Sequence, residues 1–275
     1  MLSQLFSDIG SIWGKYGTVY LTGIGNTLIL ATVATLIGCI IGFFCGIMQT
    51  IPCSPGDLWV KRFFLKLLRG IIRAYVEVFR GTPMILQAVF IYYGMPYFFG
   101  VTFKDIWTVS ILVVSINTGA YMAESVRGGI MSIDPGQFEG ARAIGMNHFQ
   151  TMLYIILPQT LRNIMPQIGN NYIINVKDTS VMFIIGFQDF FAVHKMVSGA
   201  IFKYFPSAFL EMGGYLFLTL LASFLLRKLE KKLAGNSNYE LVNTDQLVLT
   251  AGTYSFSGEA PYDEKSKDYK GEKHE

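Results

Sequence analysis

The stretch that most constrains the fold lies between Lys15 and Asp57, where no charged residue occurs. A helix needs about 20 consecutive apolar residues to cross the hydrocarbon core of a bilayer, and we place one crossing near residues 18–48. The apolar stretch is too long for a cleaved signal peptide, so we expect the chain to retain it. Only 15% of the residues are charged, whereas an average soluble domain has about 25%. The sequence therefore predicts an integral membrane protein.

Four further gaps between charged residues predict four more crossings. These stretches cover residues 81–103, 106–123, 163–176 and about 205–226, and the last of them contains one charged residue, Glu211. Pro83 and Pro166 lie in the second and fourth of the five predicted helices and are expected to bend them, which neighbouring helices tolerate. We therefore expect an all-α polytopic membrane protein with five transmembrane helices.

Lysine and arginine set the expected orientation, because cytoplasmic loops carry an excess of both. Most of them lie between the first and second predicted helices, between the third and fourth, and after the fifth. This asymmetry places the N-terminus outside and the C-terminus in the cytoplasm. It also places the connection between the third and fourth helices on the cytoplasmic side.

The last part of the chain differs in composition from the rest. Residues 1–235 carry more basic than acidic side chains, whereas residues 236–275 carry more acidic ones and show no apolar period. Such a segment buries too little apolar surface to fold alone. We expect residues 1–235 to form a transmembrane domain and residues 236–275 an acidic, disordered cytoplasmic tail.

Three glycines stand four residues apart within the first predicted helix, at Gly38, Gly42 and Gly46. In an α-helix this spacing puts them on one face, where the absence of side chains lets a second helix approach closely. We expect this face to pack against a helix of the same chain rather than against a second copy.

Motifs of catalytic and metal-binding chains are absent from the sequence. It contains no phosphate-binding G-x-x-x-x-G-K-[ST] loop, no H-E-x-x-H, no G-x-S-x-G and no cysteine pair. The three histidines and three cysteines are scattered, which is not the ligand spacing of a metal site. We therefore expect that this chain has no catalytic residue, no metal, no cofactor and no nucleic acid partner.

Polar side chains within the predicted helices are costly in a membrane and often line a solute path. The alternative is that they hydrogen-bond between helices, and the sequence leaves both open. The candidates for a substrate path are Gln87, Asn117, Tyr121 and Asn171. The candidates for a gate or for ion pairs are Glu77, Arg80, Glu124, Lys177 and Asp178. Together they predict a polar cavity between the helices.

The cytoplasmic connection at about residues 134–157 combines two helical signals joined by a glycine. Pro135 suits the first turn of a helix, and Gly145 can take the left-handed conformation that ends one. Asn147 is a suitable N-cap for a second helix. The first helix carries small and charged residues, so it is either a surface for docking another protein or an interfacial loop that only ends two spans.

This connection resembles a signature of the membrane subunits of ATP-binding-cassette (ABC) importers, E-A-A-x-x-x-G-x(9)-I-x-L-P. The signature positions here are Glu139, Gly140, Ala141, Gly145, Ile155, Leu157 and Pro158. Every spacing is kept, and Gly140 is the one departure, because it replaces the first alanine by another small residue. The segments YVEVFRGTPMILQAVFIYYGMP and NVKDTSV look like the polar amino acid branch, which serves histidine, glutamine, arginine and cystine. The resemblance covers roughly residues 15–235.

The resemblance implies a type I importer permease, a multi-pass protein of the inner membrane that moves polar amino acids. The implied partners are ABC ATPase subunits that bind ATP and Mg²⁺, a second permease copy or related chain, and an extracytoplasmic solute-binding protein. ATP hydrolysis would then take place on the partner. The implied ATPase-coupling residues are Glu139, Gly140, Ala141, Arg142, Gly145, Leu157 and Pro158. The alternatives are a permease for another small solute, such as methionine or a phosphonate, and an ATP-independent transporter or channel.

Overall fold

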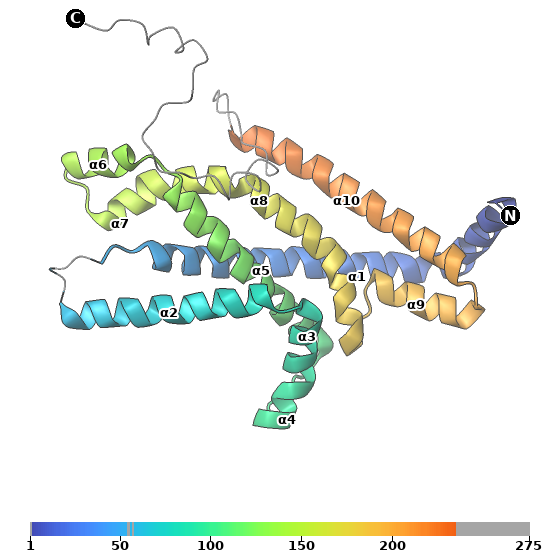
Figure 1. The fold of residues 1–275 in the computed structure, drawn as a ribbon. Coiled ribbons are helices and arrows are strands. Elements are labelled where there is room, and N and C mark those ends of the chain that lie inside the picture. Colours follow the sequence, from blue (N-terminus) through green and yellow to red (C-terminus); the bar gives the residue numbers. More distant parts are fainter. Residues whose placement is uncertain (1, 54–55, 57, 235–275) are drawn as a thin grey trace, which may run out of the picture. The chain divides into compact units, whose positions relative to one another are not determined.

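The computed structural model describes residues 2–53, 56 and 58–234, and all regular elements in this part of the chain are helical (Figure 1). The predicted all-α class is confirmed. The predicted tail, residues 236–275, lies outside the described residues, so the domain boundary and the disorder beyond it stay predictions. The sidedness of the two termini is also a prediction still.

The first predicted crossing is part of a much longer helix. α1 (Leu2–Thr50) runs without interruption through the apolar stretch. At about 1.5 Å per residue it is more than twice as long as the ~30 Å hydrocarbon core is thick. The helix therefore extends beyond the predicted span, chiefly on its N-terminal side.

Membrane-crossing candidates occur at four of the five predicted positions. Among the described residues, three helices are long and apolar enough to cross a membrane, and a fourth candidate is a helix pair bent by 54°. The three helices are Ser3–Thr50 within α1, Ile106–Met131 (α5) and Tyr204–Lys232 within α10 (Tyr204–Ala234). The bent pair joins His148–Ile185 to Phe190–Ile201.

The second predicted crossing is divided into shorter pieces. α2 (Trp59–Gly81) ends before Pro83, and the apolar run that follows, Met84–Phe99, is shorter than the three crossing helices. Thr82 is extended, with φ −120° and ψ 145°, because a following proline ring disfavours helical backbone. The bend expected at Pro83 is thus a complete break, whereas α8 (Leu157–Asp178) continues through Pro166. The divided run comprises α3 (Met84–Val89), the π-helix η1 (Phe90–Gly94) and α4 (Met95–Phe99).

The three spaced glycines of α1 pack against α5, so the prediction of a contact within one chain is confirmed. A Cβ atom on Gly42 would lie 2.8 Å from the carbonyl carbon of Met122, and one on Gly38 or Gly46 would lie 2.6 Å from an α5 side chain. Real Cβ atoms essentially never approach so closely. The partners on α5 are, in order, Thr118, Met122 and Val126. Because the residue numbers of the contact partners increase in the same direction along both helices, α1 and α5 run parallel.

A side-chain cap marks the start of α5, and a series of short helices follows its end. Asp105 accepts the backbone N–H of Thr108 at 2.7 Å, and this hydrogen bond lowers the pKa of the Asp105 carboxyl below its usual value. The connection that follows α5 contains three short elements, which lead into α8. They are α6 (Pro135–Ala143), α7 (His148–Thr151) and the π-helix η2 (Met152–Ile156).

A short helix between the fourth and fifth predicted crossings was not predicted. After α8 the chain forms the 3₁₀-helix η3 (Thr179–Ile185), turns at Gly186 with φ +91° and enters α9 (Phe190–Ile201). α9 packs on α1 and α10. A Cβ atom on Gly23 of α1 would lie 2.8 Å from the Val193 side chain, so this contact also depends on a glycine.

Candidate functional site

The turn after α6 forms a complete helix-ending motif around Gly145. Gly145 has φ +82°, in the left-handed region that favours glycine. Its N–H donates to the Arg142 carbonyl, and the N–H of Met146 donates to the Ala141 carbonyl, both at 3.0 Å. These are the two bonds of a Schellman motif. The prediction that Gly145 ends the first helix is confirmed.

Asn147 begins the second helix through a reciprocal capping box. Its side chain accepts the backbone N–H of Gln150, and the Gln150 side chain accepts the backbone N–H of Asn147, both at 2.9 Å. Only four residues, 144–147, separate α6 from α7. Because hydrogen bonds close both ends of this connection, it holds the two short helices in a defined geometry.

Pro158 lies in the first turn of α8, and the π-helix η2 directly precedes it. Proline has no N–H to offer the carbonyl four residues earlier, that of Tyr154. The N–H of Leu157 instead reaches the Met152 carbonyl, five residues back. The signature's terminal Leu-Pro therefore coincides with a register change inside one helical run from His148 to Asp178.

One side of α6 is held by the fold, and the other faces outward. Ala141 is only 2% exposed, and Phe138 packs on the apolar cluster that includes η2. Glu139, Gly140 and Arg142 are exposed. No atom lies within 4 Å of a Cβ built on Gly140, so the departure from the signature leaves the outer face open. The exposed face of α6 is therefore charged, and at Gly140 no side chain projects from it.

Gln87 and Asn117, two of the predicted substrate-path residues, meet at the end of α2. Asn117 Nδ2 donates to Gln87 Oε1 at 3.1 Å. Both amides donate to the carbonyl of Phe79, at 3.0 Å and 3.1 Å, and Gln87 also donates to the Thr82 carbonyl at 3.0 Å. The carbonyls at a helix end lack intrahelical partners. The two amides therefore stabilise the break between α2 and α3.

The other two path residues lie on different faces. Tyr121 is 40% exposed, and its ring lies 5.4 Å from the guanidinium carbon of Arg80. It follows Asn117 by one helical turn on α5, so the two share a face. Asn171 is buried in α8 and donates to the Gln167 carbonyl at 2.9 Å. The structure thus groups Tyr121 with the two amides and places Asn171 apart.

In the part of the chain that the structure describes, the predicted gate residues do not form ion pairs with the oppositely charged gate residues near them in the sequence. Glu124 forms an ion pair with Arg127, three residues further along α5. Among the described residues, no ion pair joins Glu77 to Arg80 or Lys177 to Asp178. Arg127 was not predicted as a partner, although i, i+3 spacing of opposite charges on a helix is the signal that indicates such a pair.

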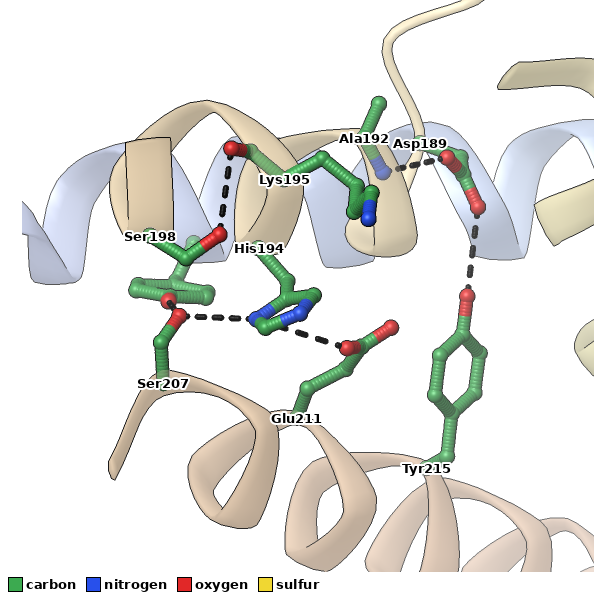
Figure 2. Close-up of polar contacts among 9 residues, drawn as sticks. Asp189, Ala192, His194, Lys195, Ser198, Ser207, Glu211 and Tyr215 are labelled. Carbon is green, nitrogen blue, oxygen red and sulfur yellow. Dashed lines mark hydrogen bonds and ion pairs between the residues drawn. The ribbon is translucent and has the colours of Figure 1, made fainter. Parts of the chain in front are cut away.

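A buried polar cluster at α9, missed by sequence reasoning, joins three helices (Figure 2). Ser207 of α10 hydrogen-bonds to the Tyr20 hydroxyl of α1 at 2.7 Å and to His194 Nδ1 of α9 at 2.8 Å. Glu211 Oε2 lies 3.7 Å from the same histidine nitrogen. No local pattern indicates this cluster, because its members come from distant segments.

Replacing Ser207 by alanine would remove the shared hydrogen-bond partner of two buried side chains. A buried polar group without a partner costs about 1–3 kcal/mol, so we expect Ser207→Ala to lower the free energy of unfolding by about that amount. Ser198→Ala is the control, because the Ser198 hydroxyl donates to the Lys195 carbonyl of its own helix rather than to another helix in the described part of the chain. Denaturant unfolding in detergent micelles compares the two, and equal losses would contradict a role in joining the helices.

Within the described residues, no three His, Cys, Asp or Glu side chains are grouped to hold a metal ion. The site is instead a helical membrane scaffold with an exposed, capped helix at the connection after α5. The sequence of this scaffold matches a known family of membrane proteins. The family described as binding-protein-dependent transport system inner membrane component matches residues 42–235.

The chain belongs to this family. The permease is therefore an inner-membrane component of a transport system that depends on a binding protein. It is 31% identical to the glutamine transport system permease protein GlnP of Escherichia coli (strain K12), over 82% of this chain and 97% of that protein. It is also 31% identical to the arginine transport system permease protein ArtQ of Bacillus subtilis (strain 168), over 78% and 93%.

Solved structures agree with the fold. The permease matches a chain in the crystal structure of an amino acid ABC transporter with histidines, with a TM-score of 0.69 and 33% identity over 79% of this chain and 95% of that one. It also matches the MetNI methionine ABC transporter in an inward-facing conformation, with a TM-score of 0.66 and 18% identity over 80% and 98%. The second likeness concerns the fold alone.

Proposed function

We propose that the permease translocates polar amino acids across the cytoplasmic membrane as the membrane-spanning subunit of an ATP-driven importer. The observation that carries this proposal is the exposed face of α6, a short helix with hydrogen-bonded caps at both ends. The importer signature begins in this helix at Glu139 and ends at Pro158. The amino acid specificity of the relatives GlnP and ArtQ supports the substrate class. ATP and Mg²⁺ bind to partner ATPase subunits in this proposal, and the permease itself is not the enzyme.

The proposed assembly has three kinds of partner. ATPase subunits receive the exposed face of α6, where Glu139 pairs with a basic residue of the ATPase groove and Arg142 stays at the rim. A second permease copy or related chain completes the translocation cavity. A solute-binding protein delivers the amino acid from outside. The family's dependence on a binding protein supports the last of these partners.

ATP binding closes the ATPases and moves α6 in this mechanism. The four-residue connection around Gly145 passes the movement to α7 and α8, because hydrogen bonds close both of its ends. The cavity then changes from inward-facing to outward-facing. Such a change requires that the docked contacts differ in free energy between the two states.

Asn117, Tyr121 and Glu124 follow one face of α5 at i, i+4 and i+7, and Arg80 stacks on the Tyr121 ring. An amino acid zwitterion needs an anionic partner for its ammonium and a cationic partner for its carboxylate. Arg80 lies over the Tyr121 ring, and Glu124, which is paired with Arg127, follows Tyr121 by about one helical turn, so both charges are near this tyrosine. We assign the substrate path to this face, with Gln87 as the support of Asn117, whereas Asn171 is buried in α8 and lies apart from it. Glu77, Lys177 and Asp178 remain gate candidates.

Tyr121→Ala is expected to weaken the apparent substrate affinity roughly 2- to 30-fold, because it removes the cation–π contact, worth about 0.5–2 kcal/mol, that holds Arg80 in place for the substrate carboxylate. Tyr121→Phe keeps the ring under Arg80 and is expected to retain most of the affinity. Amino acid uptake as a function of concentration, in liposomes that contain the complete transport complex, measures both. If Tyr121→Ala leaves affinity and selectivity unchanged, the assignment of this face is wrong.

The function itself is tested by uptake into proteoliposomes that contain the permease, its ATPase and its binding protein. We expect ATP-dependent uptake of one or more of histidine, glutamine, arginine and cystine. If only methionine or a phosphonate were taken up, the proposed substrate class would be wrong, whereas the proposed ATP-driven import would stand. Uptake that needs no ATP would overturn the proposal.

A further inference from the structure

The helix α2 has three distinct sides. One side packs into the protein, where Ile72 and Val76 are buried in an apolar cluster with Cys45 of α1 and Ala123 of α5. The other two sides are largely uncovered by the chain, and one is basic and one apolar. Figure 1 shows α2 as a long helix after the connection from α1. A protein in water does not leave so much of a helix bare, so these two sides need a partner.

The basic side consists of four regularly spaced residues, which we call the cationic row: Arg62, Lys66, Arg69 and Arg73. At 100° per residue they fall in a sector about 60° wide, and they extend about 17 Å along the axis. Lys66 and Arg73 are exposed, and Arg62 is half-buried. Arg69 donates to the Ile51 carbonyl, which ties α2 to the segment after α1. The row therefore has three cations available for a ligand.

The apolar side adjoins the cationic row and is more exposed than the row. Trp59 is 75% exposed, Phe64 63%, and Phe63, Leu67 and Ile71 are about half exposed. The Trp59 and Phe63 rings stack on each other, with centroids 5.7 Å apart. Contiguous exposed apolar surface of this kind marks an interaction site. Tryptophan beside basic residues is typical of the interface between headgroups and acyl chains.

The fold also places the start of α2 at the end of the bundle that carries α6. Since α1 and α5 run parallel, the segments that follow them leave at the same end. α2 follows α1, and α6 follows α5. The positive-inside rule assigns this end to the cytoplasm. The cationic row thus lies where the anionic headgroups of the inner leaflet are available.

We propose that the cationic row and the adjoining apolar side of α2 bind anionic phospholipids of the inner leaflet. The row contacts the headgroup phosphates, and the side bearing Trp59 and Phe63 contacts the acyl chains. A second copy of this chain fits less well, because a two-fold contact through α2 would oppose the same cations to each other. Glu77 is the only acidic residue of α2. The inference rests on the membrane location of the permease and not on its substrate.

The proposal is tested with a variant that removes three charges, Arg62→Gln/Lys66→Gln/Arg73→Gln, which leaves the Arg69 contact intact. The purified transport complex is titrated with phosphatidylglycerol in neutral detergent micelles, and retained lipid is counted by native mass spectrometry. Each cation near an anionic surface strengthens binding about fivefold, so we expect roughly 100-fold weaker binding. Phosphatidylcholine is the neutral comparison lipid and is expected to bind both proteins alike.

Two control variants make the result decisive. Arg62→Lys/Arg73→Lys keeps the charges and is expected to retain phosphatidylglycerol. Lys228→Gln/Lys231→Gln/Lys232→Gln removes the same charge from the end of α10 and is expected to retain most of the binding. If the α10 variant lost as much phosphatidylglycerol binding as the α2 variant, the loss would reflect net charge alone, and the proposed lipid site on α2 would be wrong. Dissociation of the permease chains from each other, with lipid binding unchanged, would assign α2 to a protein interface instead.

Discussion

Replacing Gly42 by alanine is expected to destabilise the permease more than any other single added methyl group on α1. The new Cβ would lie 2.8 Å from the Met122 carbonyl carbon and 2.9 Å from the Ala123 backbone nitrogen. Backbone atoms cannot rotate away, so the two helices would have to separate. Overpacking of this kind costs about 1–3 kcal/mol, and Gly42→Val would cost more. Unfolding in detergent micelles and the yield of folded protein from membranes measure the effect.

Gly25→Ala is the matched control on the same helix, because no atom lies within 4 Å of a Cβ built there. Its helix propensity gain is expected to make it neutral or slightly stabilising. If Gly42→Ala and Gly25→Ala had the same stability, the close approach of α1 and α5 would not be required for folding.

Replacing Gly145 by valine is expected to uncouple ATP turnover from transport while the permease still inserts and folds. A left-handed backbone costs an ordinary residue about 1–2 kcal/mol, and a β-branched residue is a stronger outlier there. The Schellman bonds to Ala141 and Arg142 would then be lost or distorted. We expect at least a tenfold fall in substrate-stimulated ATP hydrolysis, measured in liposomes that contain the complete complex.

Gly140→Ala is the comparison for this prediction, five residues away in the same segment. The space around Gly140 is open, its backbone is helical, and alanine restores the importer signature. We expect its coupled ATP turnover to equal or exceed that of the unaltered permease. Unchanged turnover in Gly145→Val would show that the connection after α6 does not transmit the movement.

Features encoded over a few neighbouring residues were predictable from the sequence. The apolar stretches located α1, α5 and α10, because hydrophobicity over a span is a local property. The turn at Gly145 and the cap at Asn147 were also predictable, since helix ends depend on residues three or four positions apart. The contact face of α1 followed from the spacing of three glycines.

Features that depend on distant residues were not predictable. Gln87 and Asn117 are 30 residues apart in the sequence and meet at the break between α2 and α3. Tyr20 and Ser207 are 187 residues apart, and no periodic signal links them. The break in the second crossing was underestimated for a related reason, because hydropathy measures composition and not continuity of the helix.

The seating of the glycines of α1 on α5 restricts how the permease can move. Sliding one helix along the other would force a glycine out of its seat and drive neighbouring side chains into backbone. We therefore expect α1 and α5 to move as one rigid pair of helices, with α6 following α5 at one end of the pair. We expect a pair that moves as a unit to shift against its neighbours, which include the π-helical turn before Pro158 and α3 beyond the break at Pro83.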